Sequence, residues 1–229
     1  MAYRRTENVV RRLAARHDAI LAAAAALAAE AGINAVQIVP VAERAGIAAG
    51  TVYRYFPSKT DLVAALVAAV SERETGAMRR AADAAPGPLS AIAAAVTTFS
   101  ARALREPRLA FALLAEPVDA DTDAARLDYR KALAAELTRR LAAAIAARAL
   151  PEQDVAVTAP ALLGAIMEGL VGPLAAPAGD AARMRGAVQT VTLFALRAAG
   201  VVDAHARGLV VQTKVPEGMR TNEGARASP

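Results

Sequence analysis

The sequence contains no cysteine, no tryptophan and only two histidines, His17 and His205. Without cysteine, the chain has no disulfide, no thiolate nucleophile and no zinc site built on sulfur. Two histidines are too few for a multi-histidine metal site, and no pair of carboxylates stands out by its spacing in an apolar setting. Neither a glycine-rich phosphate loop nor a G-x-S-x-G motif occurs. We therefore expect no catalytic residue, no metal and no cofactor.

Long uncharged runs and secretion signals are also missing. The longest uncharged stretch, residues 84–101, contains Pro86-Gly87-Pro88 and several hydroxyl residues, so we do not expect it to span a bilayer. The N-terminus begins MAYRRTENVVRR, and no apolar segment with a small-residue cleavage site follows. These features predict a soluble, cytoplasmic protein with no membrane partner.

Aromatic residues make up only 3% of the chain, whereas alanine occurs 64 times. Alanine is the best helix former and is depleted in strands, so the composition predicts an all-α protein. Each alanine buries little apolar area, and the core therefore needs several helices to accumulate enough burial.

Positive charge is concentrated near the N-terminus. Residues 1–60 hold eight Arg and Lys against four Asp and Glu, whereas the remaining residues hold nineteen against eighteen. Within the first sixteen residues, only Glu7 opposes Arg4, Arg5, Arg11, Arg12 and Arg16. A basic arm next to a folded unit indicates contacts with phosphates, although a solvated, frayed N-terminus has the same charge pattern.

Glycine and proline breaks divide the chain into about nine predicted helices. The first four are expected at residues 10–31, 37–45, 48–56 and 58–82, and five more at 89–104, 106–115, 120–149, 152–175 and 179–201. Ser58-Lys59-Thr60-Asp61 has the pattern of a capping box that opens the fourth helix. We expect a three-helix head at residues 1–57, a helical body at 58–202 and a mostly disordered tail at 203–229.

Residues 37–59 read QIVPVAERAGIAAGTVYRYFPSK, which predicts two short helices joined by a tight glycine turn. This is the pattern of a helix-turn-helix motif, here at residues 37–56. At 100° per residue, Val52 and Phe56 of the second helix point into the head, whereas Gly50 and Arg54 point away from it. The outward face is therefore small at its N-terminal end and carries a guanidinium further along.

The flanks of this second helix carry hydroxyl groups. Thr51 and Tyr55 line one flank, and Ala49 and Tyr53 line the other. The small residues would let the helix backbone approach a duplex closely, and the hydroxyls can bond phosphate oxygens. Arg54 can reach a base edge or a phosphate. For each tyrosine taken alone, half-buried packing is an equally good interpretation.

Lys59 is expected at the start of the fourth helix, where the helix dipole disfavours a cation by roughly 0.3–1 kcal/mol. A cation makes sense there if an anion binds, because the ammonium and the free N–H groups then converge on one phosphate. The alternative is a lysine that extends freely into solvent.

The stretch AERAGIAAGTVYRYFPSKTDL closely resembles the signature of TetR-type (TetR/AcrR family) helix-turn-helix regulators. The resemblance covers about residues 10–70, and the body is similar to the family only in helix number and length. The resemblance implies DNA contacts from Gln37, Ala49, Thr51, Tyr53, Tyr55 and Lys59. Helical geometry adds Gly50 and Arg54 to the candidate DNA-binding residues.

Three positions depart from the usual family pattern. Gln37 and Ala48 stand where the family commonly has a capping hydroxyl, and Pro40 replaces a usual acidic residue. Loss of the caps would weaken phosphate contacts or leave the short helices more mobile. Since the tip of the second helix is small, we hypothesise that specificity depends on Thr51, Arg54, the N-terminal arm and DNA shape.

The last two long helices are the expected dimer surface, as the family resemblance also implies. Their apolar stripes are Leu162, Leu163, Ile166, Met167, Leu170 and Val171, with Gly164, Gly169 and Gly172 between them, and Val188, Val191, Phe194, Ala195 and Ala198. Two-fold symmetry would suit a palindromic operator. Ordinary intrachain core is the alternative.

The few large side chains of the body are the candidates for an effector pocket. They are Phe99, Phe111, Leu113, Leu114, Tyr129, Met167 and Phe194, although plain core packing is the better explanation for any one of them taken alone. Polar candidates for orienting a ligand or pairing at the subunit contact are Arg108, Glu116, Asp128 and Glu168, which the sequence does not rank.

Together these features predict a homodimeric, one-component transcriptional regulator, most often a repressor in this family. The dimer would bind double-stranded operator DNA, and an unknown small, largely apolar effector would release it. The alternative is a helical ligand-binding or scaffold protein with a weakened DNA-binding head. A helical-bundle enzyme is a more remote third interpretation.

Overall fold

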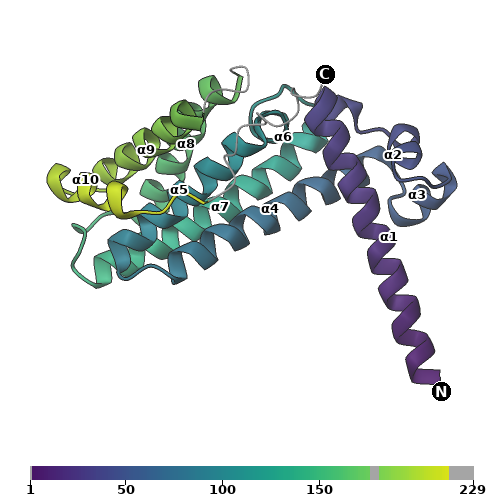
Figure 1. Cartoon of the computed structure of the whole chain (residues 1–229), viewed down its shortest axis with the longest axis horizontal. Helices are drawn as coiled ribbons and strands as arrows, with labels where there is room; N and C mark the ends of the chain where they lie inside the picture. Colours follow the sequence, from purple (N-terminus) through teal and green to yellow (C-terminus); the bar gives the residue numbers. More distant parts are fainter. Residues whose placement is uncertain (1, 176–180, 217–229) are drawn as a thin grey trace, which may run out of the picture. The chain divides into compact units, whose positions relative to one another are not determined.

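The computed structural model describes residues 2–175 and 181–216, which fold into helices with no strand among them (Figure 1). The all-α prediction is confirmed. Besides the short 3₁₀ helix η1 (Ile33–Ala35), the described helices are α1 (Ala2–Ala31), α2 (Ile38–Arg44), α3 (Ala49–Tyr55), α4 (Lys59–Asp83), α5 (Pro88–Arg105), α6 (Pro107–Leu114), α7 (Ala120–Ala146), α8 (Val155–Ala175), α9 (Ala181–Ala198) and α10 (Asp203–Gln212).

The first helix is longer than expected. It begins at Ala2 rather than near residue 10, because the first ten residues contain neither glycine nor proline to stop it. It ends before Gly32, whose φ of +84° favours glycine, as the sequence predicts. The predicted basic arm is thus part of α1, although the side chains of residues 2–8, Arg4 and Arg5 included, lie outside the described part of the chain.

The chain forms two compact units. We call Met1–Val70 with Arg108–Leu127 the head unit, and Ser71–Pro107 with the chain from Asp128 onward the body unit. The predicted division at residue 57 does not coincide with this boundary. Most of α6 and the first part of α7 group with the head unit, which sequence patterns could not indicate because they lie far along the chain.

Within the head unit, α2 packs against both α1 and α3, and η1 packs against α1. Large apolar side chains on the inner faces of these helices form the core, namely Ile20, Ile33, Val36, Val41, Val52, Leu62 and Leu66. Ser58 accepts a hydrogen bond from the Asp61 backbone N–H at 3.1 Å and donates one to the Asp61 carboxylate at 2.7 Å, so the predicted cap of α4 is confirmed.

Within the body unit, α5 packs against α9 and α8, and α10 packs against α9 and α5. The prediction of a disordered tail from residue 203 is wrong for residues 203–212, which form α10. Ala206 and Leu209 lie one turn apart and are buried, while Asp203 accepts hydrogen bonds from Arg197 and Arg207. These contacts stabilise a helix that could not be predicted from the polar composition of this segment. The end of the predicted tail, residues 217–229, lies outside the described residues.

One described helix, Val155–Leu174 of α8, is long and apolar enough to cross a membrane by length and composition alone. Glu168 interrupts its uncharged run, so a search for uncharged stretches does not find it. Only 28% of its most apolar window is buried within the chain, which leaves apolar surface of α8 exposed.

Candidate nucleic-acid interface

The turn between α2 and α3 is held by backbone hydrogen bonds. The N–H groups of Gly46 and Ile47 donate to the carbonyls of Glu43 and Ala42, at 3.1 and 3.0 Å. Gly46 has a φ of +66°, and a Cβ added there would meet no atom within 4 Å. Glycine is thus favoured at this turn for its backbone conformation, not for space.

The structure orients α3 as the sequence predicts. Val52 is completely buried and Phe56 nearly so, whereas Gly50 and Arg54 are exposed. Tyr53 has 52% of its surface exposed. Arg54 and Tyr53 are therefore available to a partner outside the head unit.

Tyr55 fits the packing interpretation better, since it is half-buried. Its ring lies 6.4 Å, centroid to centroid, from the ring of His17 on α1, and at the same distance from Phe56. The His17 ring in turn lies 5.3 Å from that of Phe56. His17 lies one turn before the buried Ile20 on α1, which is the local sequence signal that it faces the end of α3.

The two short helices lack side-chain caps. Gln37 and Ala48 occupy the N-cap positions of α2 and α3, and neither makes a capping hydrogen bond. The Gln37 amide instead donates to the carbonyl of Asn34 at 3.0 Å, and Gln37 is exposed. The helices form nonetheless, because Val41 and Val52 anchor them to the core.

Lys59 is the first residue of α4, and it lies in the field of a carboxylate that the sequence could not indicate. The pKa of Asp119 is below its usual range, first because the Thr122 backbone N–H donates to it, and to a smaller extent because of the Lys59 ammonium. Lys59 and the half-buried Thr51 and Ala49 complete the candidate set near α3. Lys59 is thus a cation with a partial counter-charge nearby.

Two polar candidates for effector binding have other contacts in the head unit. The Glu116 carboxylate accepts a hydrogen bond from the Ile33 backbone N–H at 3.0 Å, and Arg108 donates to the carbonyl of Glu30 at 3.1 Å. A Cβ on Gly32 would lie 2.7 Å from a carboxylate oxygen of Glu116. These contacts join the α6–α7 corner to the end of α1, just before the helix-turn-helix.

The apolar effector candidates do not gather in one unit. Phe111, Leu113 and Leu114 belong to the head unit, whereas Phe99, Tyr129 and Met167 belong to the body unit. Phe194 is also in the body unit but has 48% of its surface exposed on α9, so its expected place in an interior pocket is wrong within this chain. A common pocket for these residues stays a prediction.

Sequence reasoning missed a buried polar cluster in the body unit. Arg102 donates to both oxygens of the buried Glu74, at 2.5 and 2.9 Å. Burial, and next the Glu74 charge, raise the pKa of Tyr129 well above its ordinary value. The completely buried hydroxyl of Ser100 has no hydrogen-bond partner in the described part of the chain. Glu74 and Arg102 lie on different helices, 28 residues apart, so spacing could not reveal the pair.

Among the described residues, no three His, Asp or Glu side chains lie close enough together to hold a metal ion. The chemistry that the head unit offers is instead one of hydroxyl, amide and guanidinium donors on an outward face. Such donors bind phosphate oxygens and base edges.

Comparison with known proteins agrees with this geometry. Residues 20–66 match the family model described as bacterial regulatory proteins, tetR family. The chain is 39% identical over 110 residues to the HTH-type transcriptional repressor KstR of Mycolicibacterium smegmatis, which covers 48% of this chain and 54% of that protein. It is 52% identical over 58 residues to KstR of Rhodococcus jostii, covering 25% and 27%. The longer match spans about half of the length of its relative.

Solved structures resemble the fold over more of the chain. RolR in complex with resorcinol has a TM-score of 0.66 at 21% identity, covering 91% of this chain and 98% of that one. FadR of Bacillus subtilis in complex with stearoyl-CoA has a TM-score of 0.66 at 17% identity, covering 80% and 98%. At these identities, the likeness shows the fold alone. The matched region is more specific: residues 20–66 are similar to the tetR family of bacterial regulatory proteins, and the relatives that share this region are named as repressors.

Proposed function

We propose that the protein is a one-component transcriptional repressor whose dimer binds palindromic operator DNA and is released by a small-molecule effector. The observation that carries the proposal is the orientation of α3, which buries Val52 and Phe56 and leaves Gly50, Tyr53 and Arg54 exposed. A helix held in this way can enter a major groove with its outward side chains at the base edges. The similarity to repressors named KstR supports the same function.

The effector is proposed to be small and largely apolar, and to bind in the body. Related folds have been solved with resorcinol and with stearoyl-CoA, each a ligand of that other protein. Phe99, Tyr129 and Met167 remain the candidates in the body unit. To switch the gene fully, the effector must bind the form that releases DNA about 10⁴-fold more tightly than the DNA-binding form.

The dimer surface is proposed on α8 and α9, but on a different face from the one the sequence indicated. The larger apolar residues of the predicted stripes, such as Leu162, Ile166 and Val188, are buried within their own chain. The exposed residues of α8 are mostly small, namely Ala156, Val157, Pro160, Ala161, Gly164, Ala165, Gly169 and Gly172, with the charged Glu168 among them, and Phe194 is exposed on α9. Small residues let two helices approach closely, and pairing this face would cover the exposed apolar surface of α8.

A helical ligand-binding or scaffold protein is the second candidate, because neither α2 nor α3 has a side-chain cap. Weakly capped helices would bind DNA less firmly or not at all. In both proposals the protein is cytoplasmic and has no catalytic group, metal or cofactor.

A salt series separates the two candidates. A gel shift on the DNA upstream of the protein's own gene, or on fragments selected from genomic DNA, should give a steep decrease of log K with log salt concentration. Lys59→Ala should make the slope shallower by about one, because one phosphate contact is lost. Lys131→Ala is the matched control, since Lys131 lies on α7 of the body unit and pairs with Asp128 at 3.0 Å. Absence of binding at low salt would favour the scaffold candidate.

Arg54 should behave differently from Lys59. If Arg54 contacts a base edge, Arg54→Ala should both lower affinity, by about 1–3 kcal/mol, and relax the base preference at one operator position. Lys59→Ala should lower affinity equally for all sequences. An Arg54→Ala protein that keeps both its affinity and its base preference would show that this residue does not contribute to specificity.

A further inference from the structure

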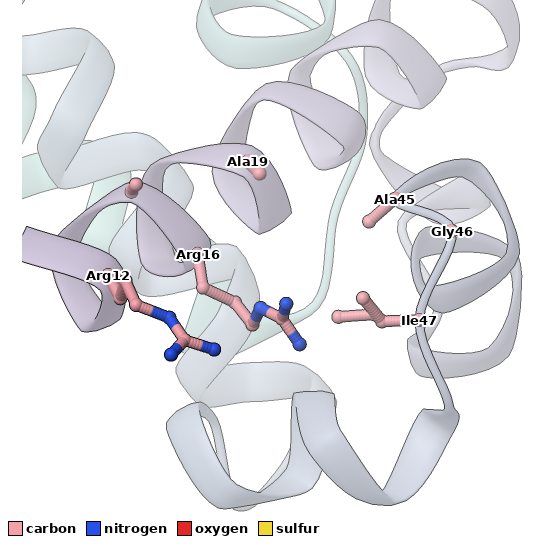
Figure 2. A pocket seen from close by; sticks show the side chains of 7 residues that line it. Arg12, Arg16, Ala19, Ala45, Gly46 and Ile47 are labelled. Carbon is pink, nitrogen blue, oxygen red and sulfur yellow. The ribbon is translucent and has the colours of Figure 1, made fainter. Parts of the chain in front are cut away.

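Charged side chains without an ion pair mark two exposed surfaces in the described part of the chain. In the head unit, Arg12 and Arg16 line a hollow of about 380 Å³ between α1 and the turn at residues 45–47 (Figure 2). The proposed DNA contact accounts for this first surface, because phosphates would neutralise the arginines. In the body unit, Glu168 of α8 and Arg183 of α9 are also exposed, and neither makes an ion pair with another described residue.

This second surface is the side of α8 and α9 that faces away from α5. Both helices pack against α5 as well as against each other. Helical spacing places Glu168 in line with the exposed Ala165 and Gly172 of α8. On α9, Arg183 precedes the exposed Phe194 by about three helical turns, so these two share a side. The surface is therefore small and apolar except for one carboxylate and one guanidinium on neighbouring helices.

The two charges do not meet within one chain because of how α8 lies against α9. Only residues 176–180 join the two helices, so they pack side by side in opposite directions. A Cβ added to Gly169 would lie 3.9 Å from the Val191 side chain, which fixes the register. Glu168, one position earlier, is therefore level with the residue after Val191, roughly 13 Å from Arg183 along the helix axis.

A second copy of the chain can bring the charges together. A two-fold axis perpendicular to the helices reverses their direction, so Glu168 becomes level with Arg183 of the partner subunit when the axis crosses midway between them. In this register the midpoint lies beside Gly172 of α8 and Ala187 of α9. Both residues are small, and helices approach each other most closely where the contacting side chains are small. The charges and the small residues thus place the axis at the same point.

We propose that an ion pair between Glu168 and Arg183 of the partner subunit fixes the register of the homodimer and selects an identical chain as the partner. The proposal rests on the dimer of the proposed function and adds the residues that decide which chain can join it. Two-fold symmetry forms the pair twice in each dimer. Apolar surface surrounds both charges, so a charge left without its partner would be costly in the interface. A chain that lacks either charge is therefore rejected.

Charge reversal in both directions tests the pair. Glu168→Arg and Arg183→Glu are each measured in the full chain by sedimentation equilibrium, together with the parent protein. Each variant alone should raise the dimer dissociation constant at least about tenfold, because like charges then face each other twice. An equimolar mixture of the two variants should return the dissociation constant to within about threefold of the parent's, since every pair in the mixed dimer again has opposite charges.

Arg185→Glu is the matched control, because it makes the same charge change on the same helix. Arg185 precedes Phe194 by about two and a half turns, so it is exposed on the other side of α9. This variant should dimerise as the parent does. All three variants should keep the helical circular dichroism of the parent, because the altered side chains are exposed.

The outcomes separate this ion pair from the rest of the proposed function. If the single variants dimerise as tightly as the parent, or if mixing them restores nothing, the ion pair is wrong although the dimer stands. A parent protein that stays monomeric throughout the concentration range would overturn the dimer and the ion pair together. The gel shift of the parent protein measures DNA binding independently of either result.

Discussion

The arginines of the two units differ in their carboxylate partners. In the body unit, Arg102 donates twice to the buried Glu74, and Arg140 bonds both Glu136, at 2.8 Å, and Asp83, at 2.7 Å. In the head unit, Arg44 pairs with Glu30, but Arg12, Arg16 and Arg54 lie exposed with no carboxylate partner among the described residues. Arginine thus binds buried acids in the body unit, whereas three arginines beside α3 keep exposed positive charge.

The difference follows from where the carboxylates are. Glu74 and Glu136 are buried, and a buried carboxylate is strongly destabilising unless it is paired and hydrogen-bonded. The arginines around them are therefore needed to stabilise the folded body unit. Among the described residues, the arginines beside α3 face no buried acid, so their charge is available to an external anion. The partners of an arginine decide whether it can bind such an anion, and the arginine count of the chain carries no such information.

The head unit is joined instead by polar side chains that bond the backbone. Glu116 accepts from the Ile33 N–H, Arg108 donates to the Glu30 carbonyl, and Arg126 donates to the carbonyls of Ala112 and Glu116. Such contacts hold the backbone in place and do not involve the charged side chains at α3.

The largest effect is expected from the body unit's buried acid. The Glu136 side chain is 2% exposed and bonds Arg79, Arg139 and Arg140. Glu136→Gln removes the charge that these three cations share, and we expect the free energy of unfolding to fall by about 3 kcal/mol. Urea denaturation of the full chain at neutral pH measures this change.

The exposed pair of Lys131 and Asp128 on the same helix is the control. Lys131→Ala should change the free energy of unfolding by less than about 0.5 kcal/mol. Equal effects of the two substitutions would mean that burial does not set the value of ion pairs in the body unit.

The next effect tests how the head unit is joined. Gly32 combines a φ of +84° with a Glu116 oxygen 2.7 Å from where a Cβ would lie. Gly32→Ala should lower the free energy of unfolding by about 2–3 kcal/mol, from backbone strain together with the clash. Gly46→Ala, with a φ of +66° and no atom within 4 Å of the new Cβ, should show the strain alone, about 1 kcal/mol.

Glu116→Ala separates the two contributions at Gly32. In that background, Gly32→Ala should cost no more than Gly46→Ala does, since the clashing carboxylate is gone. A double variant in which the full cost of Gly32→Ala persists would show that the contact with Glu116 does not limit this position.

The helical fold was predictable from the sequence wherever the signal is local. Ser58 capping α4, Gly32 ending α1 and the inward pair of Val52 and Phe56 all follow from residues within a few positions of each other. The tenth helix was missed because its stability comes from packing against α9 and α5, which its own polar sequence does not encode. The grouping of α6 with the head unit was missed for the same reason.

In the candidate site, too, the local features could be predicted and the long-range contacts could not. The exposed positions of Gly50 and Arg54 could be predicted from the helical period. The Lys59 ammonium helps to lower the pKa of Asp119, and Glu116 accepts a hydrogen bond from the Ile33 N–H. The partners lie about 60 and 83 positions apart in the sequence, so no helical period indicates these interactions. A helical pattern identifies the apolar stripe of α8 but not which partner covers it, and most of that stripe is buried within its own chain.

The smallest effect compares the tyrosines of the two units. Burial and the neighbouring Glu74 raise the pKa of Tyr129, so its folded state holds a proton that the unfolded state loses near pH 10. This contribution to stability is fully present below that pH and is lost as the pH rises above it. Between pH 8 and 10.5, the parent protein should therefore lose about 1 kcal/mol more of unfolding free energy than Tyr129→Phe does.

Tyr53→Phe is the control, because it removes the same hydroxyl group from an exposed position on α3. Urea denaturation at several alkaline pH values measures all three proteins. If the profiles of Tyr129→Phe and the parent run parallel, the phenol of Tyr129 ionises equally readily in both states, and the body unit does not seclude it from water. If only the pH profile of Tyr129→Phe differs from that of the parent, the body unit buries this tyrosine away from water, whereas the head unit leaves Tyr53 exposed to solvent and to a partner.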